Sequence, residues 1–214
     1  MLDIHLAITD QFVDRWVILE ASRAFSGIPK PYYLQDNLHR YQQQYGDRIQ
    51  VVTLELAADQ INLVCETRMR QSIAPALAVC DPNDIIIHGD LDEIINPESW
   101  QAIIAEMDLH DRPVSCGFDM YMYKFDQRAE RGWKGSVVAR RRMFDTPHEL
   151  YKGASIKRKN RDHCVGLPYP VGWHWTWMGS DDLIRNKVIS CIETQHRNPE
   201  EMLQAFKRKD TVAA

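Results

Sequence analysis

The chain has 214 residues, of which 44% are apolar and 26% charged, with a formal net charge of −4 at pH 7. This length and apolar content suit a single domain over residues 1–214 that buries a core, and they exclude a disordered chain. The acidic balance excludes binding of nucleic acid through bulk positive charge. The apolar runs are far shorter than the ~20 residues of a membrane-spanning helix, so no transmembrane segment is expected.

The first residues and the cysteines indicate a reducing compartment, the cytoplasm. The segment Met1–His5 contains Asp3, whereas a secretory leader begins with a basic region. The 5 cysteines are odd in number and show no C-x-x-C spacing, which argues against a disulfide framework or a structural zinc site. We therefore expect a soluble cytoplasmic protein whose cysteines are small core residues.

The first third of the chain alternates candidate strands and helices. Residues 2–12 mix apolar positions in a way that leaves helix and strand open. Residues 16–20 and 49–54 are typical of strands. Residues 62–80 predict a helix, which Pro75 should kink or split.

The middle of the chain predicts a buried strand followed by a capped helix. Ile85–Ile87 is an uninterrupted apolar run between turn signals, typical of a central parallel strand that is covered on both faces. Asn96 and Pro97 then suit the N-cap and first position of a helix. The apolar stripe of that helix is Trp100, Ile103, Ile104 and Met107.

The second half is richer in strands. Residues 114–123, 135–140 and 172–177 are predicted strands, and residues 180–196 form a predicted final helix. Alternation of strands and helices in the first half predicts an α/β fold with a mixed, mostly parallel central sheet flanked by helices. The later strands are expected to add antiparallel pairs.

The strongest chemical signal is the acidic cluster after the run Ile85–Ile87. Asp90 and Asp92 are two residues apart, so in extended geometry both side chains point to one side. Two convergent carboxylates at the carboxyl end of a strand suit Mg²⁺ or Mn²⁺, and such an ion typically carries a diphosphate. The alternative is an acidic turn that caps a helix and holds no metal.

A run of three alternating tryptophans is the second signal. Strand alternation predicts Trp173, Trp175 and Trp177 on one face, with His174 and Thr176 on the other. Exposed indoles stack well on the apolar face of sugar rings, although each indole could equally belong to the core. His174 is either an ordinary histidine or a nitrogen ligand that completes the metal site with Asp90 and Asp92.

Two weaker signals involve positive charge. The loop 25–31 contains Gly27, which permits close backbone approach, and Lys30, a cation suited to phosphate, although the same residues suit a plain turn. The clusters 140–142 and 157–161 are basic. They suit a solvated face better than a contact with a diphosphate or an anionic acceptor.

Taken in order, several segments resemble glycosyltransferase family 17, whose members include the enzyme that adds bisecting N-acetylglucosamine to N-glycans. The resemblance covers nearly the whole chain and rests on these segments: Val13–Glu20, Phe25–Pro31, Arg70-Gln71, Asp84–Ile87 with Asp90–Ile94, Trp133–Gly135, Gly172–His174, and Lys187–Ser190 with His196. Family members usually carry a further strand upstream of residues 2–6, which the resemblance implies is lacking in this chain.

The resemblance implies a GT-A-like fold and an inverting transfer from a UDP-sugar, expected to be UDP-GlcNAc, onto a glycan acceptor. Asp90-Leu91-Asp92 corresponds to the metal motif, so Mn²⁺ or Mg²⁺ is the expected cofactor and Asp90, Asp92 and His174 the expected ligands. The other implied roles are catalysis by Asp90, Asp92, Glu93 and Asp119, donor binding by Glu20, Ser26, Gly27, Lys30 and Arg70, and sugar stacking by Trp133, Trp173, Trp175 and Trp177.

Three points stay open at this stage. An inverting transfer needs a carboxylate base, and the candidates are Glu93, Asp119, Asp126, Asp181 and Asp182. A sugar-binding module without activity is the non-enzyme alternative. A phosphohydrolase of the haloacid-dehalogenase type also places D-x-D after an apolar strand, but Glu93-Ile94 departs from the residues that family needs.

Overall fold

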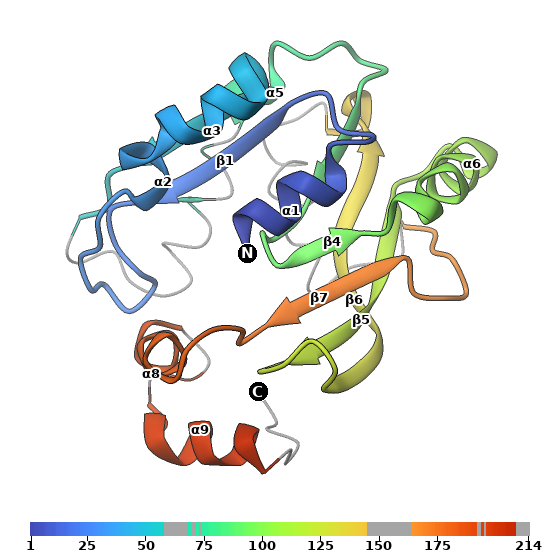
Figure 1. The fold of residues 1–214 in the computed structure, drawn as a ribbon. Helices are drawn as coiled ribbons and strands as arrows, with labels where there is room; N and C mark the ends of the chain where they lie inside the picture. The colour runs from blue at the N-terminus through green and yellow to red at the C-terminus, as the bar shows by residue number, and fades with distance from the viewer. Residues whose placement is uncertain are drawn as a thin grey trace. The chain divides into compact units, whose positions relative to one another are not determined.

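The computed structural model describes residues 1–57, 68–69, 72, 74–144, 164–191, 194 and 196–208. The chain is mixed α/β and divides into two compact units, each assembled from two stretches (Figure 1). The first unit comprises Met1–Val13 with Val79–Met178, and the second comprises Asp14–Ala78 with Gly179–Ala214. That the chain forms one domain stays a prediction.

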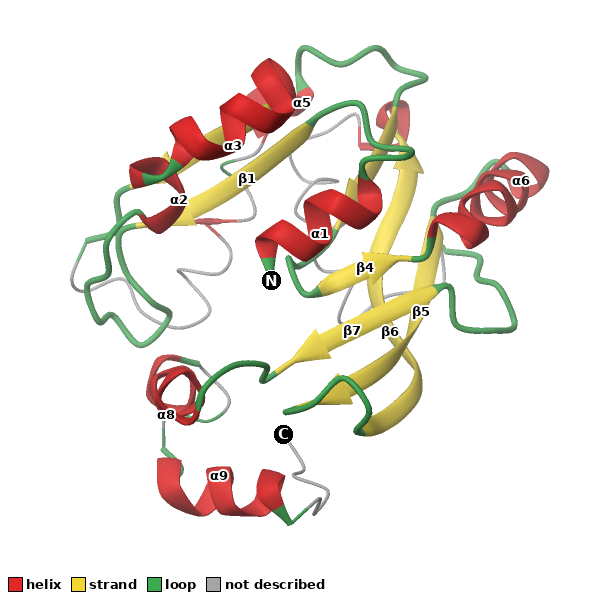
Figure 2. Cartoon of the chain, in the orientation of Figure 1, coloured by secondary structure: helices red, strands yellow, loops and turns green. Residues whose placement is uncertain are grey.

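The first unit is built on a five-stranded sheet, whose strands are yellow in Figure 2. The strands lie in the order β3-β6-β5-β7-β4, and only the pairing of β5 with β7 is parallel among the four described pairings. The mostly parallel sheet expected from the sequence is therefore not confirmed. The bounds are β3 (Ile85–His88), β4 (Glu93–Ile95), β5 (Val114–Met122), β6 (Arg128–Arg140) and β7 (Gly172–Thr176).

Strand β3 is an edge strand, so the prediction of a central parallel strand is wrong. Among the described strands it pairs with β6 alone, and that pairing is antiparallel. The apolar run nevertheless has a physical reason. Ile85 and Ile87 pack against one core cluster, whereas Ile86 packs against a second one that contains Phe144.

Strand β5 divides the sheet into two faces. Val114, Cys116 and Phe118 are fully buried and define the core face, which packs against Ile103 and Met107 of α6 (Trp100–His110). The intervening residues Ser115, Gly117 and Asp119 define the outer face. The pairing of β5 with β6 shifts register three times, and the extra residues lie on β6.

Two helices complete the described part of the first unit. Residues 2–12, left open between helix and strand, contain helix α1 (Leu2–Thr9), which buries Leu6 and contacts β4. Asn96 is an N-cap, because its side chain accepts a hydrogen bond from the backbone N–H of Glu98, but it caps a 3₁₀ turn that precedes α6, and the N-cap of α6 itself is Ser99. Short 3₁₀ turns η2 (Pro97–Ser99) and η3 (Arg141–Phe144) precede α6 and follow β6.

The second unit contains a parallel pair of strands, β1 (Trp16–Ala21) and β2 (Ile49–Leu54), which confirms both predicted strands. About half of the predicted helix 62–80 lies outside the described residues. Within the described part, the helix with defined bounds is α5 (Ala74–Leu77). The predicted final helix is shorter than expected, because α8 ends where the backbone of Cys191 becomes extended. The remaining elements are α2 (Tyr33–Asp36), α3 (Leu38–Tyr45), η1 (Gly46–Arg48), α8 (Asp181–Ser190) and α9 (Pro199–Lys207). None of the helices in the described ranges is long and apolar enough to cross a membrane.

Candidate active site

The acidic motif forms a tight turn between β3 and β4. The backbone N–H of Glu93 donates to the carbonyl of Asp90 over 3.0 Å, so residues 90–93 form a β-turn, here called the acidic turn. The expectation that Asp90 and Asp92 share one side of an extended segment is therefore wrong. The alternation rule applies to strands and does not hold through a turn.

The acidic turn joins opposite edges of the sheet. Strands β3 and β4 are the two edge strands, yet only four residues separate them. The chain from His88 to Glu93 spans at most about 18 Å, whereas the outer strands of a flat five-stranded sheet lie about 19 Å apart. Because a turn is shorter than an extended chain, the sheet must curl to bring its edges together.

Glu93 lies at the inside of this curl. Its side chain is 2% exposed, and Oε2 accepts hydrogen bonds from the Ser136 hydroxyl (2.7 Å) and the Asp90 backbone N–H (3.2 Å). A Cβ on Gly89 would lie 1.9 Å from Oγ of Ser136, so only glycine fits beside this contact. The buried carboxylate therefore ties the acidic turn to β6.

His174 of β7 faces the acidic turn from the core face. Its Nε2 lies 3.5 Å from Oδ2 of Asp92, and the backbone N–H of Trp175 donates to the Asp92 carbonyl over 2.9 Å. The Trp133 ring covers the imidazole with ring centroids 4.1 Å apart. Asp92, His174, Trp133 and Glu93 therefore lie together, as the sequence predicted for the first two.

His5 is a site residue that the sequence did not reveal. Its Nδ1–H donates to the carbonyl of Leu91 at the centre of the acidic turn, over 2.9 Å. Burial lowers the pKa of His5, and the bond to Leu91 and the charge of Asp92 partly offset this. The sequence left the segment that carries His5 open between helix and strand. It therefore could not predict that the His5 side chain contacts a residue 86 positions later in the chain.

Two of the predicted sugar-stacking tryptophans lie on the outer face. Alternation along β7 turns Trp173 and Trp175 away from the side that carries His174. Their rings stack with centroids 5.5 Å apart, and Phe125, which sequence reasoning missed, meets Trp175 edge-on. Trp177 does not join them, because it follows the end of β7 with φ 58° and is buried.

The structure separates the candidate bases. Asp119 is paired in register with Trp173 and so belongs to the outer face, where Oδ2 lies 3.7 Å from Arg128. Asp126 is exposed in the turn between β5 and β6. Of the candidates in the first unit, only Glu93 lies beside the pair Asp92–His174.

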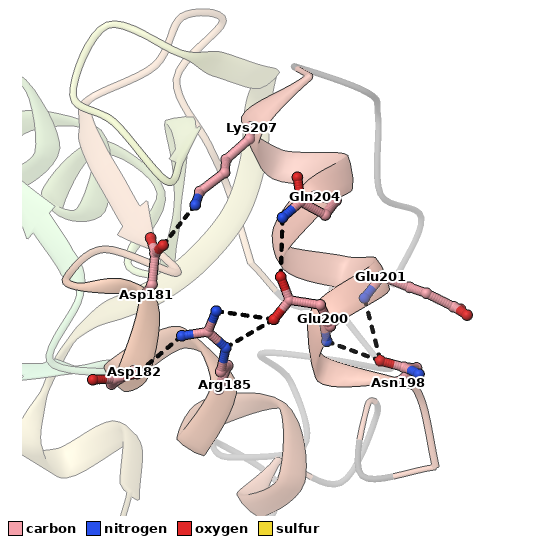
Figure 3. A network of polar contacts seen from close by, with 8 residues as sticks. All are labelled: Asp181, Asp182, Arg185, Asn198, Glu200, Glu201, Gln204 and Lys207. Carbon is pink, nitrogen blue, oxygen red and sulfur yellow. Dashed lines mark hydrogen bonds and ion pairs between the residues drawn. The ribbon is translucent and has the colours of Figure 1, made fainter.

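Asp181 and Asp182 belong to an ionic network between α8 and α9 (Figure 3). Lys207 lies 2.6 Å from Asp181, and Arg185 lies 2.9 Å from both Asp182 and Glu200. The Asp182 side chain is 88% exposed. These carboxylates have a ready structural role in joining the two helices.

The predicted donor loop belongs to the second unit. The Glu20 carboxylate is buried and accepts from the backbone N–H groups of Leu34 and Gln35. It therefore holds the chain after Lys30. Burial lowers the pKa of Lys30, and the charge of Glu20 partly offsets this.

The same loop contains a buried hydroxyl and a glycine with positive φ. Oγ of Ser26 is buried and has no hydrogen-bond partner within the described part of the chain. Gly27 has φ 82°, which glycine adopts without a steric penalty. Arg23 holds the loop by donating to the carbonyl of Gly27 over 3.0 Å. Arg70 and the basic cluster 157–161 lie outside the described residues.

The donor set at the acidic turn fits a divalent cation in part. No group of three or more His, Cys, Asp or Glu side chains in the described ranges is placed to hold a metal ion, so Asp90 does not join Asp92 and His174. Mg²⁺ and Mn²⁺ commonly take one or two protein ligands and fill the remaining positions with water and substrate phosphate. The 3.5 Å separation of Asp92 Oδ2 and His174 Nε2 suits two such ligands of one ion.

Comparison with known proteins supports the transferase interpretation. The model of glycosyltransferase family 17 matches residues 1–165, which include the acidic turn, Trp133 and the donor loop. No curated protein and no solved structure gives a significant match. The match favours a transferase over a phosphohydrolase.

Proposed function

The chain belongs to glycosyltransferase family 17 and is a glycosyltransferase, and from this premise we propose its substrates and mechanism. It transfers a sugar, N-acetylglucosamine from UDP-GlcNAc, onto a glycan acceptor with inversion at the anomeric carbon, in a reaction that depends on Mn²⁺ or Mg²⁺. The observation that carries this proposal is the pair formed by Asp92 of the acidic turn and His174 of β7, because contacts from α1 and β6 hold that turn in place.

Asp92 and His174 would hold the metal ion in this proposal. When bound, the ion would neutralise the charge that develops on the leaving diphosphate. The surrounding contacts keep the two side chains in place: His5 fixes the Leu91 carbonyl, β7 fixes the Asp92 carbonyl, and Trp133 covers the imidazole. A site that is positioned before substrate binds loses little energy to reorganisation.

Glu93 is the proposed general base. It would accept the proton of the acceptor hydroxyl as that oxygen attacks the anomeric carbon. Its Oε2 is oriented by Ser136 and by the backbone of Asp90, and it shares the core face with Trp133. Trp133 offers the aromatic surface nearest to His174 for stacking of the acceptor sugar.

Ser26 and Lys30 are proposed to bind the donor phosphates, on chemical grounds. A buried hydroxyl without a partner gains a hydrogen bond when an oxyanion binds. A partly desolvated ammonium gains from a negative charge close by.

A thermal-shift and turnover experiment tests the proposal. UDP-GlcNAc with Mn²⁺ should raise the melting temperature, and Asp92→Asn should abolish that rise. The exposed Asp126→Asn provides the control, because it makes the same chemical change away from the turn. Glu93→Gln should keep the rise in melting temperature but lose release of UDP in the presence of acceptor. Absence of a shift with every UDP-, GDP- and dTDP-sugar would overturn the proposed donor class.

A further inference from the structure

The outer face of the sheet carries a pocket that contains none of the residues proposed for the transfer reaction. It encloses about 490 Å³ and is formed by β5, β6 and the segment Cys164–Pro170. Ser115 and Gly117 contribute from β5, and both belong to the outer face. The pocket therefore opens on the side of the sheet opposite to Glu93 and His174.

Two neighbouring glycines leave the space of the pocket. Gly117 pairs in register with Lys134, and Gly132 is an extra residue of β6 beside it. The atoms nearest to a Cβ on Gly117 would be those of the Gly132 backbone, at 3.7 Å. A Cβ on Gly132 would meet nothing within 4 Å, yet its φ of 75° disfavours any side chain there. The chain thus leaves space at a point where side chains would ordinarily fill the surface of the sheet.

The chemistry of the pocket is that of an anion site. Arg131 and Lys134 line it, and among the described residues that line it none is acidic. Register supports this placement, because Lys134 pairs with Gly117 and Arg131 with Asp119, both on the outer face. The Asp119 carboxylate has Arg128 as its own partner at 3.7 Å.

The buried hydroxyl of Ser115 is further evidence for a ligand in this pocket. Ser115 is 9% exposed and lines the pocket, and its Oγ has no hydrogen-bond partner among the residues that the structure describes. A buried hydroxyl without a partner costs free energy, and a bound oxyanion would supply the missing acceptor.

An aromatic surface adjoins the pocket. Trp173 pairs in register with Asp119, and Gly117 precedes Asp119 by two residues, about 7 Å along the strand. Trp175 covers one face of the Trp173 ring, so its other face is directed back along β7, toward Gly117. Phe125 closes the far side of Trp175. The aromatic residue that lines the pocket itself is Tyr169, so a ligand must extend beyond the pocket along β7 to reach Trp173.

We propose that this pocket binds an acidic saccharide. Arg131 and Lys134 hold the carboxylate, sulfate or phosphate group, the Ser115 hydroxyl donates to it, and the sugar ring rests on Trp173. Charge-assisted hydrogen bonds supply the affinity for the oxyanion, and the aromatic surface selects a sugar over a free anion. This second site does not depend on the donor, the metal or the acidic turn.

Protection of a cysteine offers a direct test. Cys164 is partly exposed and lines the pocket, so a bound ligand should slow its alkylation by iodoacetamide. The probe is a hyaluronan tetrasaccharide, which carries carboxylates, compared with neutral chitotetraose and with inorganic phosphate. We expect the acidic tetrasaccharide to protect Cys164, as measured by mass spectrometry of the labelled peptide, while Cys80 and Cys191 react unchanged. Equal protection by chitotetraose overturns the role of charge, and equal protection by phosphate alone overturns the saccharide.

Substitutions distinguish the contribution of the two basic side chains to saccharide binding from that of the Ser115 hydroxyl. The double variant Arg131→Gln with Lys134→Gln should weaken binding of the acidic tetrasaccharide about tenfold or more in isothermal titration. Arg15→Gln, an exposed residue of the second unit, makes the same kind of charge change and should have no effect. Ser115→Ala should weaken binding about threefold without lowering the melting temperature. If the double variant binds as the wild type does, the proposal fails.

The outcome is independent of the proposed transfer reaction. Asp92→Asn, which should abolish the donor-induced shift, should leave protection of Cys164 intact. Protection that persists in this variant supports a separate site. Protection that is lost in it places the acidic saccharide at the acidic turn and overturns the present proposal.

Discussion

The Ser136 hydroxyl donates a hydrogen bond to Oε2 of Glu93 over 2.7 Å, and both residues are almost fully buried. This contact joins β6 to β4, although two other strands, β5 and β7, lie between them in the sheet. One pair of side chains thus spans the inside of the curled sheet and holds the acidic turn against it.

Loss of this contact should destabilise the fold. Ser136→Ala leaves a buried carboxylate without one of its donors, and we expect the free energy of unfolding to fall by about 1–3 kcal/mol. Chemical denaturation measures the change. Ser115→Ala is the matched control, because its buried hydroxyl has no partner to lose. Equal losses in the two variants would contradict the structural role given to Ser136.

Acidification should destabilise the fold through His5. Burial lowers the pKa of His5 below its ordinary value of 6.5, so between these two values the unfolded chain binds more protons than the folded one. Stability is therefore greatest above pH 6.5 and declines as the pH falls through this window. His5→Gln should flatten the decline, measured as the free energy of unfolding against pH. Parallel curves for the two proteins would show that His5 does not titrate in this way.

Trp133 and Trp175 should differ in their effect on transfer. Trp133 covers His174 on the core face, whereas Trp175 lies on the outer face. We expect Trp133→Leu to raise KM for the glycan acceptor about tenfold, since base-to-ring stacking energies of 1–3 kcal/mol set the scale for an aromatic platform. Trp175→Leu should leave that KM unchanged in the same assay. A larger effect from Trp175→Leu would place the acceptor on the outer face.

The aspartates of α8 should be dispensable for turnover. Asp181 and Asp182 serve the ionic network with Lys207 and Arg185, and both are substantially exposed. Asp181→Asn and Asp182→Asn should retain wild-type turnover, measured as release of UDP. Their melting temperatures should differ from the wild type by a small amount that shrinks as salt is added. Loss of turnover in either variant would restore it as a candidate base.

Local signals in the sequence predicted local structure well. The bounds of β2 and the cap at Asn96 follow from alternation and from side-chain chemistry within a few residues. Pairing partners could not be predicted in the same way. The run Ile85–Ile87 reports that both faces of a strand are covered, but it carries no information on the direction of its neighbour or on its place at an edge.

The candidate site was predicted in its chemistry but not in its geometry. Asp92 and His174 do lie together, because strand β7 pairs with β4 directly after the acidic turn. The separation of Trp133 from Trp173 depends on the extra residues of β6, which alternation alone does not reveal. Ser136 and His5 act on the turn from distant parts of the chain, where no motif marked them.

The position of the acidic turn also bears on whether the edges of the five-stranded sheet can pair with those of a second copy. Exposed sheet edges invite strand addition by a second chain, and long edges do so most. Here the edge strands β3 and β4 have four and three residues. Because the strands are short, each offers only a short row of backbone N–H and C=O groups to a second chain. The turn also holds the two edges close together. The residues proposed for catalysis thereby also limit edge-to-edge aggregation, so variants that loosen the turn should be screened for self-association as well as for activity.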